Sequence, residues 1–315
     1  MKIKKLIEKK PLSIKQFYEK RNKILFLHQM GGLGDVFIHR MMFEDVKSLI
    51  PEAYIVLACL PEYIDAAKNH PYIDEVVDSK TVNHNDYLIC YNTCVTVADR
   101  YEYKTAPFCK EHRADIWGKY IGLELKNHNM HFNINTEYGL SKLKEVKKNC
   151  QPSIAFIPTS AMASKSLNSC QIKGILSKLK DFNIFGINKK IIPEFTELNI
   201  PFFTGQSIPQ WMSIIASADY VISVDTAAFH LAGGLGKPLT GIFAWSDGKV
   251  YGKYFDFILV QKHRDNGNWD CGPCFKFNSC PKMSGARKPC IEFTVDEIYS
   301  GIEKMLEKWP SPTLL

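Results

Sequence analysis

The 315-residue chain lacks the features of a membrane-spanning or secreted protein. No apolar run approaches the roughly 20 residues that a membrane-spanning helix needs. The basic start, residues 1–23, is not followed by a secretory apolar core and cleavage site, because "ILFLHQM" (24–30) is short and runs into glycines. We therefore expect a cytoplasmic protein. Peripheral association with the inner face of the membrane is an open alternative.

Motifs for binding RNA or DNA are also missing. The chain has 40 Lys and Arg against 33 Asp and Glu, and basic residues cluster near the N-terminus. Such a cluster attracts nucleic acid, anionic lipid or a phosphorylated ligand, or is simply a solvated extension. The pattern favours the solvated extension, and without a recognition motif we expect no nucleic-acid partner.

The dinucleotide fingerprint G-x-G-x-x-G is not met either. Gly32 and Gly34 follow an apolar run, but Phe37 stands where the third glycine would be. The sequence therefore gives no indication of a nicotinamide cofactor.

Apolar runs typical of strands alternate with helical patterns along the whole chain. One series covers residues 23–149 and a second begins at "PSIAFIP" (152–158). This alternation is typical of parallel sheets covered by helices. We predict an α/β fold of two Rossmann-like domains, 1–150 and 151–315, with the last helix (294–309) packing back toward the N-terminal domain.

The first strand ends in the turn "GGLGD" (31–35). Ligands bind in doubly wound domains where strands end and helices begin, and glycine lets a ligand approach the backbone. Asp35 opens the following helix, so it is interpreted either as an N-cap or as a carboxylate that accepts a proton from a hydroxyl. His39, one turn later, is expected to be a packed or exposed helix residue.

A similar turn, "SVDTAAFHLAGGLGKP" (223–238), occurs in the second series. The N–H groups at Thr226–Ala228 would point out of a helix N-terminus, which is a site for anions. Asp225 and His230 lie within reach of the same turn. The pattern equally suits a close-packed crossover, and the residues alone leave both interpretations open.

The stretch "VDTAAFHLAGGLGKP" resembles the D-[ST]-G-x-x-H-[LI]-A-x-A-L-G-K-P signature of glycosyltransferase family 9, the ADP-heptose:lipopolysaccharide heptosyltransferases. "GLGDVFIHRMMFEDVKSLIPEAYI" (32–55) resembles that family's opening. "IPTSAMASKSLN" (157–168) resembles its central loop. "GGLGDV" is also similar to the opening of bacterial glycogen synthases, but the paired-glutamate motif of those enzymes is not found here.

The resemblance implies a GT-B architecture, in which two Rossmann-like domains face each other. It implies an inverting, metal-independent transferase that moves a heptose-like sugar from a nucleotide sugar, with ADP favoured, to a saccharide or glycolipid acceptor. No D-x-D motif, which binds metal and diphosphate in the other large glycosyltransferase fold, occurs in the sequence.

The resemblance also assigns roles to residues. Asp35 would be the base and Lys165 would stabilise the leaving diphosphate. The donor-binding residues would be Gly32, Gly34, Thr159, Asp225, Thr226, Ala227 and His230.

A second function class is a binding or interaction protein on a decayed transferase scaffold. Ala227 stands where the family has glycine, and Ser166–Leu167 stands where it often has arginine and tryptophan. Retention of Asp35, Lys165, Asp225 and His230 argues for the enzyme.

Ten cysteines are present, and four of them lie close together: Cys271, Cys274, Cys280 and Cys290. Four thiolates could close a tetrahedral structural zinc site, although the spacing differs from that of paired C-x-x-C knuckles. Free thiols or a disulfide in a long loop are favoured over zinc. The other six are expected to be small buried hydrophobes.

Overall fold

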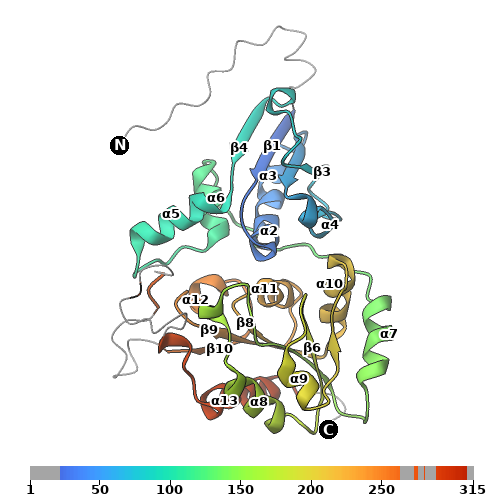
Figure 1. Cartoon of the computed structure of the whole chain (residues 1–315). Coiled ribbons are helices and arrows are strands. Elements are labelled where there is room, and N and C mark those ends of the chain that lie inside the picture. Colours follow the sequence, from blue (N-terminus) through green and yellow to red (C-terminus); the bar gives the residue numbers. More distant parts are fainter. Residues whose placement is uncertain (1–21, 263–272, 276–279, 281–288, 311–315) are drawn as a thin grey trace.

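The computed structural model describes residues 22–262, 273–275, 280 and 289–310. Two parallel sheets organise this part of the chain, one in each half (Figure 1). The N-terminal sheet has the order β3-β2-β1-β4, and the C-terminal sheet has the order β10-β9-β8-β5-β6-β7. In each sheet the strand order reverses beside the first strand, between β1 and β4 and between β5 and β8. Doubly wound folds bind ligands at such reversals.

The N-terminal half forms as the alternation predicts, and its two central strands are buried along nearly their whole length. Its strands are β1 (Lys23–His28), β2 (Tyr54–Cys59), β3 (Glu75–Asp78) and β4 (Ile89–Asn92). Its α-helices are α2 (Leu33–His39), α3 (Phe43–Leu49), α4 (Ile64–Ala67), α5 (Val95–Thr105) and α6 (Arg113–Tyr120), with 3₁₀ turns η1 (Arg40–Met42), η2 (Pro61–Tyr63) and η3 (His84–Asp86).

The C-terminal half repeats this plan with a larger sheet. Its strands are β5 (Ser153–Ile157), β6 (Asn183–Ile187), β7 (Phe202–Phe203), β8 (Tyr220–Val224), β9 (Leu239–Phe243) and β10 (Ile258–Gln261). Its helices are α8 (Ser169–Lys178), α9 (Pro193–Glu197), α10 (Ile208–Ser217), α11 (Ala227–Gly234), α12 (Gly248–Tyr251) and α13 (Val295–Lys308), with 3₁₀ turns η4 (Ala163–Lys165) and η6 (Pro289–Ile291).

Helix α7 (Glu137–Val146) belongs spatially to the C-terminal half, although it precedes residue 151. It packs along α10, and Gly139 permits this because a Cβ there would lie 2.1 Å from the Ser213 carbonyl oxygen. The Gly139 N–H also donates to the Ser213 hydroxyl at 2.9 Å. The chain therefore crosses between the halves before α7, and a domain boundary at 150–151 stays a prediction.

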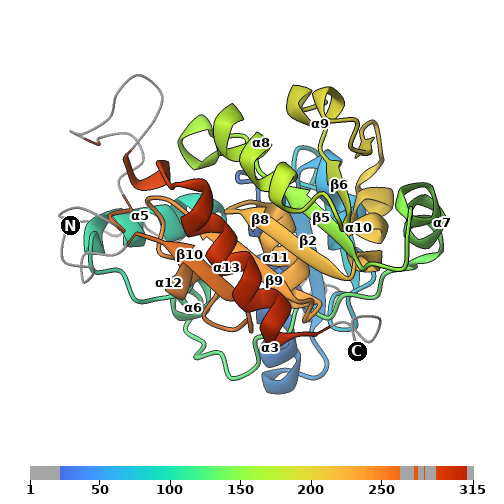
Figure 2. The ribbon, with the colours of Figure 1, turned by 90° about the horizontal axis from the view of Figure 1, so that it is seen from below.

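The last helix does not pack toward the N-terminal half as expected. α13 lies on β9, β10 and α8, all of the C-terminal half, and Figure 2 shows it running across that sheet. Its buried residues Ile298, Ile302 and Met305 explain this, because they complete the apolar core beneath β8 and β9. The prediction of the helix was correct and the prediction of its partner was wrong.

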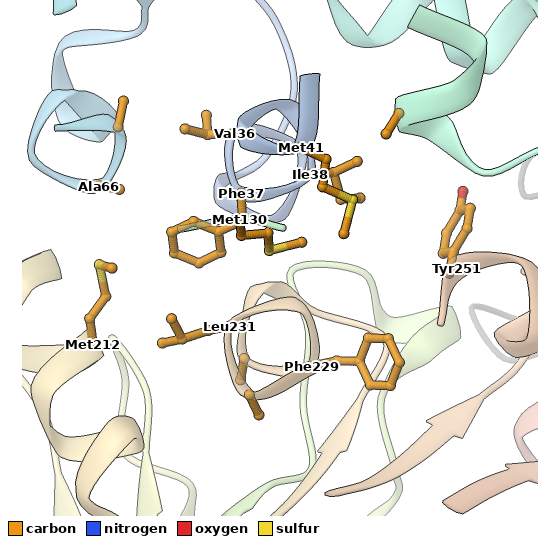
Figure 3. Packing of buried hydrophobic residues seen from close by; sticks show 14 of the residues in the cluster. Val36, Phe37, Ile38, Met41, Ala66, Met130, Met212, Phe229, Leu231 and Tyr251 are labelled. Carbon is orange, nitrogen blue, oxygen red and sulfur yellow. The ribbon is translucent and has the colours of Figure 1, made fainter. Parts of the chain in front are cut away.

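A continuous apolar core joins the two halves. Phe37 of α2, Met212 of α10 and Leu231 of α11 belong to one buried cluster with residues of both sheets. Figure 3 shows α2 lying above α11, with Phe37 and Met130 between the two halves. This packing fixes the start of α2 beside the start of α11.

Two local features differ from the predicted pattern. The helical segment that follows the first glycine turn is interrupted by the 3₁₀ turn η1, which separates α2 from α3, and helices α5, α9 and α12 were not predicted. At η1 the buried Arg40 donates to the carbonyl oxygens of Met130, Ala67 and His131 at 2.8, 2.9 and 2.9 Å.

No helix in the described part of the chain combines the length and apolarity that crossing a bilayer requires.

Candidate active site

One cleft of about 990 Å³ lies between the two halves. Its walls come from segments that follow the carboxyl ends of β1, β5, β6, β7 and β8, where the two glycine-containing turns meet. All the residues that the sequence assigned to catalysis or donor binding line it: Gly32, Gly34, Asp35, Thr159, Lys165, Asp225, Thr226, Ala227 and His230. The structure thus brings together residues separated by up to 198 positions.

Asp35 is in the first turn of α2 but is not its N-cap. The helix starts at Leu33, so the N-cap is Gly32 and Asp35 is the third helical residue. Its Oδ2 accepts from the Gly32 N–H at 2.8 Å, as a capping-box acid does. The N-cap thus lies three residues before Asp35. The turn ahead of it includes Gly31 at φ +129°, a conformation that favours glycine.

The other oxygen of Asp35 is bound by a residue that sequence reasoning missed. Oδ1 accepts from Arg113 Nη1 at 2.5 Å, and both side chains are largely buried. Burial favours the neutral acid, but Arg113, His28 and the Gly32 N–H outweigh it and lower the pKa of Asp35 below its ordinary value. Asp35 is therefore ionised at neutral pH. No sequence motif marks Arg113, since it lies 78 residues away in an ordinary helical pattern.

On the opposite wall, Lys165 and Asp225 form a buried ion pair. Lys165 Nζ lies 2.6 Å from Asp225 Oδ2 and 4.5 Å from the centre of the Trp245 ring. The Ser246 hydroxyl donates to the same Asp225 oxygen at 2.5 Å. Burial alone would raise the pKa of Asp225, but Lys165, His230 and Ser246 together lower it. Trp245 and Ser246 follow β9 and carried no recognised signal.

The N-terminus of α11 opens into the cleft beside this pair. Thr226 is the N-cap, and its hydroxyl accepts from the Ala228 N–H at 3.2 Å. The N–H groups of Thr226 and Ala227 donate to none of the described residues. They remain available to an anion, which a helix N-terminus attracts.

His230 lies one turn further along α11 and is buried against α2. Burial lowers its pKa to about 4, although Asp225 and Asp35 oppose the shift, so the imidazole is neutral at pH 7. A Cβ at Gly34 would lie 3.0 Å from His230 Cδ2 and 3.5 Å from Ala227 Cα. The glycine at position 34 thus lets α2 approach α11 closely.

Two positions considered in the sequence remain, Thr159 and His39. The Thr159 hydroxyl accepts from Asn188 Nδ2 at 2.9 Å, which fixes the loop after β5 against the loop after β6. His39 is a packed residue as expected, stacked on Trp117 with ring centres 4.6 Å apart. Lys189 and Lys190 add two exposed cations to the cleft wall, and neither was singled out in the sequence.

The cysteine cluster is only partly described, because Cys271 lies outside the described residues. Cys274 and Cys280 have free thiols, and no group of three metal-ligating side chains occurs among the residues described. Of the six scattered cysteines, Cys150 and Cys170 are exposed rather than buried. The choice between structural zinc and thiols stays a prediction.

Comparison with known proteins gives a consistent result. The chain is similar to the glycosyltransferase family 9 protein from Veillonella parvula DSM 2008 (13% identity, covering 92% of this chain and 98% of that one, TM-score 0.64). It is also similar to the iron-containing dodecameric glycosyltransferase TibC from enterotoxigenic E. coli H10407 (16%, 92% and 77%, TM-score 0.67). A third similar structure is E. coli ADP-heptose lps heptosyltransferase II (9%, 91% and 99%, TM-score 0.58).

At these identities the solved structures establish the fold alone, and no curated protein matches the chain. The family rests on a separate finding, a sequence match over residues 114–280, which is more than half of the chain. The match includes Lys165, Asp225 and the start of α11. The chain therefore belongs to glycosyltransferase family 9 (heptosyltransferase).

Proposed function

We propose that the protein is an inverting glycosyltransferase that moves a heptose-like sugar from a nucleotide-sugar donor to a saccharide or glycolipid hydroxyl. The observation that carries the proposal is the placement of Asp35 and of Lys165 with the α11 N-terminus in one cleft, on opposite halves of the molecule. A base on one wall and an anion site on the other are the two parts that such a displacement needs.

The donor is proposed to lie on the C-terminal wall. Its diphosphate would accept from the Thr226 and Ala227 N–H groups and from Lys165, since charge-assisted hydrogen bonds are the strong ones. An ADP-sugar is favoured, because TibC was solved with ADP-D-beta-D-heptose and E. coli WaaC with ADP. Both proteins share the fold of this chain.

The acceptor is proposed to enter from the N-terminal wall. Its hydroxyl oxygen would attack the anomeric carbon while Asp35 takes the hydroxyl proton. The bond between that carbon and the diphosphate oxygen breaks, and its electron pair goes to the leaving group. Lys165 and the α11 N–H groups stabilise the charge that develops there. No step passes through a metal ion, as the family resemblance implies.

The alternative, a binding protein without transfer activity, has one observation in its favour. Both carboxylate oxygens of Asp35 already accept hydrogen bonds, from Gly32 and from Arg113. A carboxylate oxygen has two lone pairs, so one site on each oxygen is left for an acceptor hydroxyl. An acceptor hydroxyl can therefore still bind the Asp35 carboxylate, which favours the transferase over the binding protein.

Asp35→Asn tests the proposal. Asparagine keeps an oxygen that can accept from the Gly32 N–H but cannot take a proton, so turnover should fall about 10²–10⁴-fold with donor affinity retained. ADP release from ADP-heptose, with and without candidate acceptors, measures turnover, and calorimetry with ADP measures affinity. Wild-type turnover in this variant would exclude Asp35 as the base. Transfer by neither wild type nor variant, with ADP still bound, would favour the binding protein.

Location and metal content are separate parts of the proposal. We propose a cytoplasmic protein with peripheral contact to the membrane that carries a glycolipid acceptor, supported by the basic N-terminal cluster. Flotation with anionic and neutral vesicles checks this. Metal analysis of the purified protein should cover iron as well as zinc, because TibC contains iron.

A further inference from the structure

Arg113, the first residue of α6, is bound by carboxylates from two other helices. Its Nε and Nη2 donate to the two oxygens of Glu102, each at 2.8 Å, in a bidentate pair. Nη2 also contacts Asp99 at 2.6 Å, and Nη1 contacts Asp35 at 2.5 Å. The Arg113 side chain is 12% exposed. One buried guanidinium thus serves three carboxylates.

A side chain of the C-terminal half covers this cluster. The Tyr251 ring, at the end of α12, has its centre 5.3 Å from the guanidinium carbon of Arg113. The Tyr251 hydroxyl donates to Glu102 Oε1 at 3.1 Å. Tyr251 also lines the cleft, so the cluster contacts both halves of the molecule beside Asp35.

We propose that Arg113 is a positioning residue for the reaction, which holds the Asp35 carboxylate in a fixed orientation and keeps it charged. The inference rests on the proposed function, in which Asp35 is the base. The fork formed by Glu102 fixes the plane of the guanidinium, and the guanidinium in turn fixes Asp35 Oδ1. Lysine, a point charge on a flexible stem, could not make all these contacts.

Because Arg113 binds three carboxylates, it keeps negative partners when Asp35 receives a proton. Protonation of Asp35 removes one of three negative partners of the arginine, and Glu102 and Asp99 remain bound. A buried cation left without a partner would be costly, and here that cost does not arise. Arg113 can therefore support both the charged and the neutral state of the base.

Removing the Arg113 guanidinium should raise the pH at which Asp35 titrates, because burial of the carboxylate would then act without a positive charge in direct contact. The titratable or charged groups that face Asp35 from all surrounding elements are Arg113, His28, His39, His230, Tyr63, Asp99 and Tyr251. Arg113 is the positive group in direct contact with the carboxylate, and Asp99 adds negative charge. Without Arg113, the Asp35 carboxyl should titrate at a pH about 1–3 units higher.

The test is the titration midpoint of Asp35 in Arg113→Gln, measured by the ¹³Cγ shift of labelled aspartate. Asp35→Asn identifies the resonance by its disappearance. The inference requires an upward move of at least about one pH unit, and an unmoved midpoint overturns it. The double variant Arg113→Gln/Glu102→Gln replaces the ion pair by two neutral amides, so it serves the same measurement if the single variant does not fold.

The pH dependence of the rate is a second measurement, and it would not change if Arg113 only stabilised the fold. In ADP release from ADP-heptose, the acid limb of the pH–rate profile should move upward with the Asp35 midpoint in Arg113→Gln. Arg113→Lys keeps the positive charge, so its acid limb should lie close to that of the wild type. Its kcat should stay low, because lysine does not fix the orientation of Asp35. A uniform loss of rate at every pH, with the limb in place, would overturn the inference. Arg100→Gln, an exposed arginine on α5, is the matched control and should leave midpoint and rate unchanged.

The two proposals fail separately. If Asp35→Asn keeps wild-type turnover, the proposed role of Asp35 fails, whatever the midpoint does in Arg113→Gln. If Asp35→Asn is inactive but the midpoint does not depend on Arg113, only the positioning role fails.

Discussion

At the scale of single residues, the charges in the cleft come as pairs whose members lie far apart in sequence. Asp35 is paired with Arg113 and Lys165 with Asp225, and each pair joins two different segments. A buried charge needs such a partner, because desolvation without one costs several kcal/mol. Replacing one side chain of either pair therefore leaves the charge of its partner buried without that counter-charge.

Lys165→Ala should weaken ADP binding about tenfold to a hundredfold. The variant removes a charge-assisted donor to the diphosphate, worth about 1.5–3 kcal/mol, and leaves the Asp225 carboxylate to repel the anion. Calorimetry with ADP measures the change. Lys173→Ala, which removes an exposed lysine paired with Glu197 on the surface, is the control. Unchanged affinity in Lys165→Ala would remove this residue from the donor site.

At the scale of elements, the crossing of α2 over α11 brings the two walls together. Position 34 has no Cβ, so the first turn of α2 rests on Ala227 and His230. Phe37, one turn further along α2, joins the same core as Leu231 of α11. The start of α2 is thus held against the start of α11 by packing, independently of any ligand.

Gly34→Ala should destabilise the protein by about 1–3 kcal/mol and reduce turnover more than Gly32→Ala does. The added methyl group would lie 3.0 Å from His230 Cδ2 and push α2 away from α11. At Gly32 the added carbon would have one atom of the described residues within 4 Å, Asp35 Oδ2 at 3.8 Å, so this variant is the matched control. Urea unfolding and ADP release from ADP-heptose measure the two effects. Equal stability of the two variants would contradict the packing argument.

Local pattern sufficed for most elements but not for their partners. The strand β1, the turn at Gly31–Gly34 and the acid Asp35 were readable because glycine and alternating apolar runs act within a few residues. Arg113 was not, because its partners come from α2 and α5, and pairing across helices leaves no periodic trace. The prediction of where α13 packs was wrong for the same reason, since the sequence of an amphipathic helix specifies its apolar face but not which sheet that face covers.

At the scale of the whole molecule, several histidines are buried as neutral rings in and near the contact between the halves. Burial lowers the pKa of His28 and His39, lowers that of His70 and His112 to about 3, and lowers that of His230 to about 4. One ring nitrogen in each of His28, His39, His112 and His230 has no hydrogen-bond partner among the described residues. Protonating these rings in the folded state would place charges in the core.

Stability should therefore fall as the pH drops below about 6.5, well above the range in which carboxylates titrate. An unfolded histidine takes up a proton near pH 6.5, whereas His112 and His70 in the folded protein do so only near pH 3. Between these values the unfolded state binds more protons, so acidification favours it, by about 2 kcal/mol per such histidine at pH 5. Above pH 7 both states are neutral and this contribution is complete. Urea unfolding at pH 7.5, 6.0 and 5.0 measures the slope.

His112→Asn isolates one of these contributions. Asparagine is a good N-cap and can replace the ring nitrogen that accepts from the Ala114 N–H at 3.2 Å, but it does not titrate. The variant should keep its stability near pH 7.5 within about 1 kcal/mol and reduce the dependence of the unfolding free energy on pH by about 1.4 kcal/mol per unit between pH 5 and 6. If the slope stays at its wild-type value, His112 gains its proton equally in both states, and burial of the ring does not control the acid sensitivity of the fold.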